Sequence, residues 1–215
     1  KTTHDPENMS EHDRCRDLLK AEAEKHGLKT RMIPSDPYPS LLAGLNVGAL
    51  TPALMLSCHL DVVQAREEQF EPHIEDNKLI GRGASDMKFA VPVFFDVLNR
   101  LNAGKEKILL AFTFDEEIGG NKGVRYLLDE VGLRPAVGFI PDGVVVMVLN
   151  WDDWGYGEQD FDLYVLDADQ NEIAVSQNIQ DSPDDDSAEL IRYKYADSGP
   201  YYVAIHGRNV TRPVT

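Results

Sequence analysis

The chain has 215 residues, a hydrophobic fraction of 42% and a net charge of -16. This length suits one large domain or two modest ones, and the apolar content is sufficient for a core. The acidity argues against a nucleic-acid partner, because phosphate binding depends on Lys and Arg. No run approaches the ~20 apolar residues of a membrane span, so no membrane partner is expected. The only two cysteines, Cys15 and Cys58, are expected to be buried free thiols.

The first two thirds of the sequence alternate helical and strand-like patterns. A helix is predicted from Ser10, a favourable N-cap, to Gly27, a natural stop. Further elements are predicted as strands at 29–33, 41–45, 53–59, 107–114 and 136–140, a hairpin of 69–75 with 78–81, and helices at 87–102 and 121–130. This alternation predicts an α/β sandwich with a mostly parallel sheet.

The pattern changes near Gly143, where no linker marks the change. Short strands are predicted at 144–150, 160–166, 172–176, 189–195 and 201–206. Their spacing is typical of a small β-sandwich. We therefore expect two domains, residues 1–143 and an acidic β module of residues 144–215, which has fourteen acidic and four basic residues.

Residues capable of metal chemistry follow the predicted strands. They lie in the segments SCHLD (57–61), GRGASDMK (81–88), DEEIGG (115–120) and PDG (141–143). Taken singly, a His-x-Asp pair is more often structural, paired glutamates usually form a solvated turn, and Asp before a helix is usually an N-cap. Strand ends line the ligand crevice of an open α/β sheet, so these segments together predict a site for zinc, with carboxylates able to bridge two ions.

The stretches SCHLDVV, GRGASDMK and FDEEIGG resemble the zinc peptidase family that includes acetylornithine deacetylase, succinyl-diaminopimelate desuccinylase, aminoacylase and carboxypeptidase G. The resemblance covers residues 10–143. It implies one or two zinc ions, with cobalt or manganese as substitutes. The implied metal ligands are His59 and Asp142 for one ion, Asp86 as the bridge, and Glu117 for the other ion.

The same resemblance implies the catalytic roles. Glu116 corresponds to the general base, and Asp61 to the carboxylate that orients His59. It also implies a cis peptide bond between Asp86 and Met87. The implied substrates are N-acyl amino acids or short peptides with a free carboxylate, and the implied location is cytoplasmic. The resemblance leaves the oligomeric state open.

Several features depart from this family. Phe89 replaces the usual Gly after DMK, and nothing in the sequence corresponds to the dimerisation domain or the final His ligand, so the catalytic domain is expected to be partial. His206 lies in the β module. It is a candidate to replace the missing final His ligand, but an ordinary strand position is the simpler interpretation. The remaining histidines are expected on the surface: His4, His12, His26 and His73. A non-catalytic metal-binding or adhesion module with a remnant peptidase domain is therefore the alternative, although the retained Glu116 favours an enzyme.

The β module resembles the pre-peptidase C-terminal β-sandwich of secreted proteases, through the stretches VLNWDDW, DFDLYVLDADQNEIAVSQN, AELI and SGPYYVAIHG. That resemblance makes secretion the alternative location. The first half of the β module is rich in aspartate, and calcium takes 6–8 oxygen ligands. The aspartates concerned are Asp152, Asp153, Asp160, Asp162, Asp167 and Asp169. Calcium is thus a second candidate cofactor. The spacing of these aspartates fits no EF-hand, however, and solvent-facing positions are the simpler interpretation.

Overall fold

The computed structural model describes residues 1–101, 103–142, 144–150, 159–167, 169–178, 188–193 and 202–209. Its α-helices are α1 (Met9–Lys25), α2 (Ala90–Arg100) and α3 (Val124–Asp129), and its 3-10 helices are η1 (Pro6–Asn8), η2 (Glu67–Phe70), η3 (Lys105–Lys107) and η4 (Glu116–Ile118). The strands are β1 (Lys29–Ile33), β2 (Ser40–Gly44), β3 (Leu54–His59), β4 (His73–Glu75), β5 (Lys78–Ile80), β6 (Ile108–Thr113), β7 (Val137–Asp142), β8 (Val144–Asn150), β9 (Asp160–Leu166), β10 (Glu172–Ser176), β11 (Ala188–Tyr193) and β12 (Tyr202–Asn209). None of the helices described is both long and apolar enough to cross a membrane.

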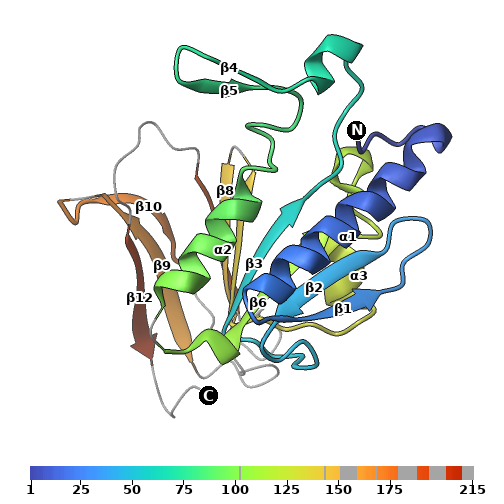
Figure 1. The fold of residues 1–215 in the computed structure, drawn as a ribbon. Coiled ribbons are helices and arrows are strands. Elements are labelled where there is room, and N and C mark those ends of the chain that lie inside the picture. The colour runs from blue at the N-terminus through green and yellow to red at the C-terminus, as the bar shows by residue number, and fades with distance from the viewer. Residues whose placement is uncertain are drawn as a thin grey trace.

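A seven-stranded sheet forms the centre of the molecule, with the order β1-β2-β6-β3-β7-β8-β11 (Figure 1). The middle strand β3 runs parallel to both β6 and β7. The outer pairs are antiparallel, so the sheet is mixed and its parallel strands lie at the centre. The predicted α/β class is confirmed, and the parallel centre is the part that positions the site.

Alternate residues of the central strands pack on opposite faces of this sheet. Leu56 and Cys58 belong to the core beneath α1 and α2, whereas Met55 belongs to the core that includes Leu127 of α3. This period of two is that of a strand buried on both sides. Figure 1 shows α1 and α2 in front of the sheet and α3 behind it, which gives three layers.

The α2 helix buries a continuous apolar stripe against the sheet. Ala90, Phe94, Phe95 and Leu98 are all buried, and their spacing places them on one helical face. Pro92 lies within the first turn of α2, where its missing N–H costs no helical bond. The predicted helix therefore exists, and it begins at Ala90, three residues later than expected.

The predicted hairpin is present and projects from the sheet (Figure 1). Asp76 and Asn77 connect β4 to β5 with φ angles of 47° and 60°. Two consecutive positive φ angles are those of a type I′ turn, which suits a two-residue hairpin and favours Asn and Asp. The turn was therefore readable from the sequence.

The helix α1 shows one error in the predicted boundaries. Its N-cap is Asn8, which makes no side-chain capping bond, and Ser10 lies inside the helix. The prediction of Ser10 as N-cap was thus wrong. The C-terminal end agrees with expectation, because Gly27 has the positive φ of 71° that commonly follows a helix. Cys58 is buried and Cys15 half-buried, and both are free thiols.

Strands beyond residue 143 contribute to two sheets. β8 and β11 extend the central sheet, whereas β10, β9 and β12 form a three-stranded sheet of their own. Leu163 and Val165 of β9 pack against Met147, Leu149 and Ile191 of the central sheet, so the two sheets share a core. A division of the chain at residue 143 stays a prediction.

Candidate metal centre

The central strands deliver two loops to one edge of the sheet. β3 ends at His59, which is in register with Thr113 at the end of the parallel strand β6. The chain after β6 then turns into η4, which contains Glu116 and Glu117. Because parallel strands end at the same edge, the imidazole and the glutamate pair emerge side by side, as the sequence predicts.

Three predicted metal ligands form one cluster. Single ligand atoms of His59, Asp86 and Glu117 all lie within 4.8 Å of one another, and no other such group occurs in the part of the chain described. Nε2 of His59 lies 2.9 Å from Oδ1 of Asp86. Zinc–ligand bonds are near 2.0–2.2 Å, so atoms this close can surround a single ion. An imidazole with carboxylates fits zinc, and it also suits cobalt or manganese.

The ring of His59 is oriented by the residue two positions further on. Its Nδ1 lies 3.2 Å from the backbone oxygen of Asp61 and 3.4 Å from Oδ1 of the same residue. Nε2 therefore faces Asp86. Burial alone would lower the pKa of His59, but the hydrogen bond and charge of Asp61, followed by the charges of Glu116 and Asp86, raise it to about 9. The site thus attracts positive charge strongly.

Asp61 is fully buried and connects two loops. Its Oδ2 accepts the backbone N–H of Glu117 at 2.9 Å and lies 2.9 Å from Nε2 of His4. Burial opposes ionisation, but these contacts and that with His59 hold the pKa of Asp61 below its ordinary value. The carboxylate is therefore suited to orient His59, which is its predicted role.

The two glutamates of η4 have different surroundings. The side chain of Glu116 is 49% exposed, and its Oε2 lies 3.9 Å from Nε2 of His59. Glu117 is less exposed, and its Oε1 accepts the backbone N–H of Val63 at 3.3 Å. Burial, and then the charge of Asp86, raise the pKa of Glu117. A cation beside Glu117 would relieve that repulsion.

The segment before α2 presents Asp86 to the cluster. The Asp86–Met87 peptide bond is cis, which confirms the prediction made from the resemblance. Met87 is fully buried, and Lys88 N–H donates to the carbonyl of Gly83 at 3.0 Å. Phe89, which replaces the family's usual Gly, is 41% exposed and lies next to the start of α2.

Asp142, the fourth predicted ligand, ends strand β7. β7 pairs with β3 so that Leu54 is opposite Val137 and Leu56 is opposite Phe139. This pairing ends at Phe139, three residues before Asp142. The side chain of Asp142 lies outside the described part of the structure, so its role as a ligand stays a prediction.

Three of the four histidines predicted on the surface are partly or fully buried, namely His4, His12 and His26, whereas His73 is exposed. His12 is completely buried, with Nε2 at 2.9 Å from the carbonyl oxygen of Thr3, so the prediction for His12 was wrong. His4 is half-buried beside Asp61, and its side chain is 16% exposed. His4 precedes the helix, so no periodic pattern covers it. His12 lies at helical spacing from Leu19 and Ala23 on the buried face of α1, so the sequence did contain a signal for its burial.

In the part of the chain described, the β-module residues considered for metal binding form no group whose ligand atoms are close enough together to hold an ion. Asp162 is buried and accepts a hydrogen bond from Nε of Arg208 at 2.8 Å, so it is not solvent-facing as expected. Nδ1 of His206 also lies 3.4 Å from Asp162. Asp167 accepts backbone N–H groups of Asp169 and Asn171 within a turn. Asp152 and Asp153 lie outside the described residues.

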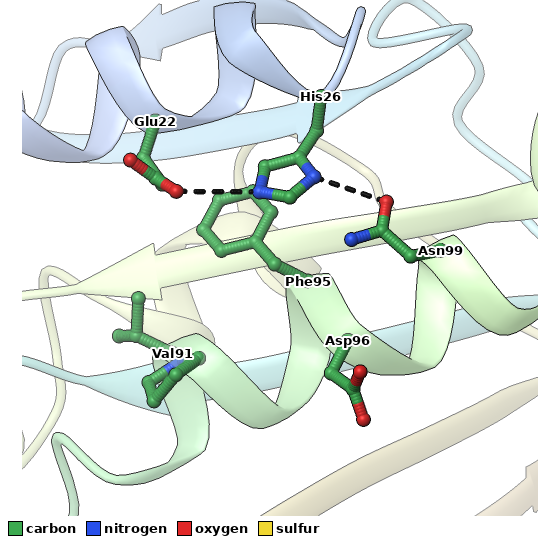
Figure 2. A pocket seen from close by; sticks show the side chains of 7 residues that line it. Glu22, His26, Val91, Phe95, Asp96 and Asn99 are labelled. Atoms are coloured by element: carbon green, nitrogen blue, oxygen red, sulfur yellow. Dashed lines mark hydrogen bonds and ion pairs between the residues drawn. The ribbon is translucent and has the colours of Figure 1, made fainter.

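A surface pocket lies away from this cluster, between α1 and α2 (Figure 2). His26 stacks on Phe95 in this pocket, with ring centroids 4.8 Å apart. Its two ring nitrogens contact Glu22 and Asn99. Each nitrogen thus has a partner within the pocket, and the pocket shares no residue with the metal cluster.

Comparison with known proteins places this chain in a family of metallopeptidases. The pattern of peptidase family M20/M25/M40 matches residues 55–200, and the chain belongs to this family. It is 33% identical over 117 residues to succinyl-diaminopimelate desuccinylase of Zymomonas mobilis, a match covering 51% of this chain and 31% of that protein. It is 35% identical over 125 residues to the enzyme of the same name from Stenotrophomonas maltophilia, with coverages of 53% and 32%.

Among solved structures, human carnosine dipeptidase 1 aligns with a TM-score of 0.49 and 20% identity, over 78% of this chain and 40% of that one. The chain spans about a third of the length of the curated relatives it matches. The family match confirms the resemblance seen in the sequence, and it extends past residue 143. The resemblance of residues 144–215 to a pre-peptidase domain stays a prediction.

Proposed function

We propose that this chain is a zinc-dependent hydrolase of amide bonds in N-acyl amino acids or short peptides. The observation that carries the proposal is the convergence of His59, Asp86 and Glu117 beside the exposed carboxylate of Glu116. A site that only held a metal would have no use for an additional, accessible carboxylate. The relatives named as desuccinylases support an acyl amide as substrate.

The metal ligands in this proposal are His59, Asp86 and Glu117, with Asp142 as the fourth. The donor set fits zinc, and Asp86, which borders both His59 and Glu117, would be the ligand shared between two ions if the site held two. A divalent ion bound there supplies a Lewis acid that polarises the substrate carbonyl and makes water more acidic. Cobalt or manganese suits the same ligands.

Two further residues, Asp61 and Glu116, have separate roles in the proposed reaction. Asp61 holds the ring of His59 so that Nε2 faces the cluster. Glu116 accepts a proton from the water that attacks the amide carbonyl, and it returns that proton to the nitrogen as the C–N bond breaks. Half-exposure of the Glu116 side chain leaves it accessible to the substrate.

Replacing the general base tests this proposal. We expect Glu116→Gln to reduce hydrolysis of N-succinyl and N-acetyl amino acids by about 10²–10⁴ in excess zinc, because Gln cannot accept the proton. Its zinc content is expected to match that of the wild type, because Glu116 is not among the ligands. Glu130→Gln, an exposed position at the end of α3, is the matched control. Equal rates for the wild type and Glu116→Gln would refute hydrolysis through this site.

A further inference from the structure

Residues 2–4 lie against the loop that carries Asp61. Thr2 is 2% exposed and Thr3 is fully buried. The backbone N–H of Val62 donates to the carbonyl of Thr2 at 3.1 Å, and the hydroxyl of Thr2 donates to the carbonyl of Leu60. Nζ of Lys88 also donates to the Thr2 hydroxyl, at 2.6 Å. The residues on both sides of Asp61 are thus bound to this segment.

His4 continues the segment and contacts Asp61 itself. Its Nε2 lies 2.9 Å from Oδ2 of Asp61, and its ring meets the ring of Tyr38 edge-on, with centroids 4.8 Å apart. Since Asp61 is fully buried, its carboxylate depends on protein donors in place of water. The other donor to Oδ2 is the backbone N–H of Glu117.

The division of donors between the two oxygens gives His4 a defined effect. With Oδ2 occupied by His4 and the Glu117 N–H, Oδ1 is the oxygen left to face Nδ1 of His59. A carboxylate held by one donor can rotate about its terminal torsion, which is broad for Asp. A second donor restricts that rotation and so helps to orient the His59 ring, whose Nδ1 lies 3.4 Å from Oδ1 and 3.2 Å from the backbone oxygen of Asp61.

We infer that His4 is a positioning residue for the metal centre. By donating its Nε2–H to Asp61, it fixes the carboxylate that orients His59 and so increases the affinity for a divalent ion. This inference rests on the proposed metal site, but not on hydrolysis. Groups hydrogen-bonded to ligand histidines are typically worth 10–100-fold in metal affinity, and His4 acts one contact further away.

His26 provides a matched comparison within the same chain. It also pairs with a carboxylate, with Nε2 at 3.3 Å from Glu22, and it also packs on an aromatic ring (Figure 2). It lies in the pocket between α1 and α2, away from the cluster. Loss of a His–carboxylate pair there should therefore leave the metal site unchanged.

Two substitutions separate hydrogen bonding from packing at position 4. His4→Gln keeps an N–H donor as many bonds from the backbone as Nε2, but it loses the ring. His4→Phe keeps a ring against Tyr38, but it loses the donor. Competition with a chromophoric chelator measures the zinc affinity of four proteins: the wild type, His4→Gln, His4→Phe and His26→Phe. Thermal unfolding without metal and the ¹⁵N signals of the His59 ring are recorded on the same samples.

We expect His4→Phe to bind zinc about tenfold more weakly and to lose the fixed His59 tautomer. His4→Gln is expected to stay within about twofold of the wild type, and His26→Phe to equal it. Wild-type affinity in His4→Phe, or equal losses in both His4 variants, would overturn the inference and leave the proposed function standing. Absence of zinc binding by the wild type would overturn both.

Discussion

Oδ1 of Asp86 lies 2.9 Å from Nε2 of His59 across 27 positions of the sequence. His59 arrives at the end of a buried strand, whereas Asp86 arrives from a loop after an exposed hairpin. The contact joins the buried centre of the sheet to the more exposed segment before α2. Both atoms belong to the proposed metal site, so a metal ion held there would tie this segment to the end of β3.

The neighbouring glutamates should respond differently to the same substitution. We expect Glu117→Gln to weaken zinc binding first and to lower activity through it, so that part of the activity returns at high zinc. Glu116→Gln is not expected to recover, because it lacks the base and not the metal. Activity measured against zinc concentration distinguishes the two. Recovery of Glu116→Gln by zinc would contradict the assigned roles.

Gly123 precedes α3 in a position with no room for a side chain. A Cβ there would lie 2.3 Å from Oδ1 of Asp115 and 2.9 Å from Cβ of Thr113. Since both neighbours are buried, we expect Gly123→Ala to destabilise the fold by about 1–3 kcal/mol. Chemical denaturation measures the change. The control is Gly48→Ala, where the nearest atom is 3.8 Å away, and an equal loss in both variants would contradict this account.

Buried His12 should make the fold sensitive to mild acid. Burial, offset by the hydrogen bond to the carbonyl of Thr3, lowers the pKa of His12 below its ordinary value, with His4 and Arg16 lowering it further and Asp61 opposing them. The unfolded chain takes up this proton near pH 6.5, whereas the folded chain does so only at lower pH. The contribution of neutral His12 to stability is therefore fully present above about pH 6.5, and it is lost as the pH falls toward the folded-state pKa.

His12→Gln keeps a donor for the Thr3 carbonyl but cannot titrate in this range. We expect its melting temperature to fall less than that of the wild type between pH 7.5 and 5.5. The melting temperatures of both proteins are measured with a metal chelator present, so that release of metal at low pH does not contribute to the change. Parallel decreases in the two proteins would show that His12 does not cause the acid sensitivity.

Local chemistry explains which parts of the fold the sequence could predict. The continuous burial of β3, the Asp76-Asn77 turn and the placement of Glu116 after β6 all follow from short-range patterns. His59 and Glu117 could be predicted together because the parallel strands β3 and β6 end at one edge of the sheet. Asp86 follows an antiparallel hairpin, so its place in the group was implied by the family resemblance.

The features that the sequence could not show depend on packing between distant segments. The side chain of His4 is only 16% exposed because its ring contacts Tyr38 and Asp61, which lie far from it in the sequence and which no local pattern reports. Asp162 is buried because Arg208, on the neighbouring strand β12, provides a counter-charge. The joining of β8 and β11 to the central sheet likewise depends on pairing between strands about forty residues apart.

The measurement that tests the central claim most directly is zinc bound per chain, determined by elemental analysis after equilibrium dialysis. We predict at least one zinc per wild-type chain and a large loss in Asp86→Asn, which removes the carboxylate next to His59. Asp96→Asn is the control, because Asp96 is exposed on α2 and pairs with Arg100. Zinc contents that are zero in the wild type, or equal in the wild type and Asp86→Asn, would contradict a metal centre at this site.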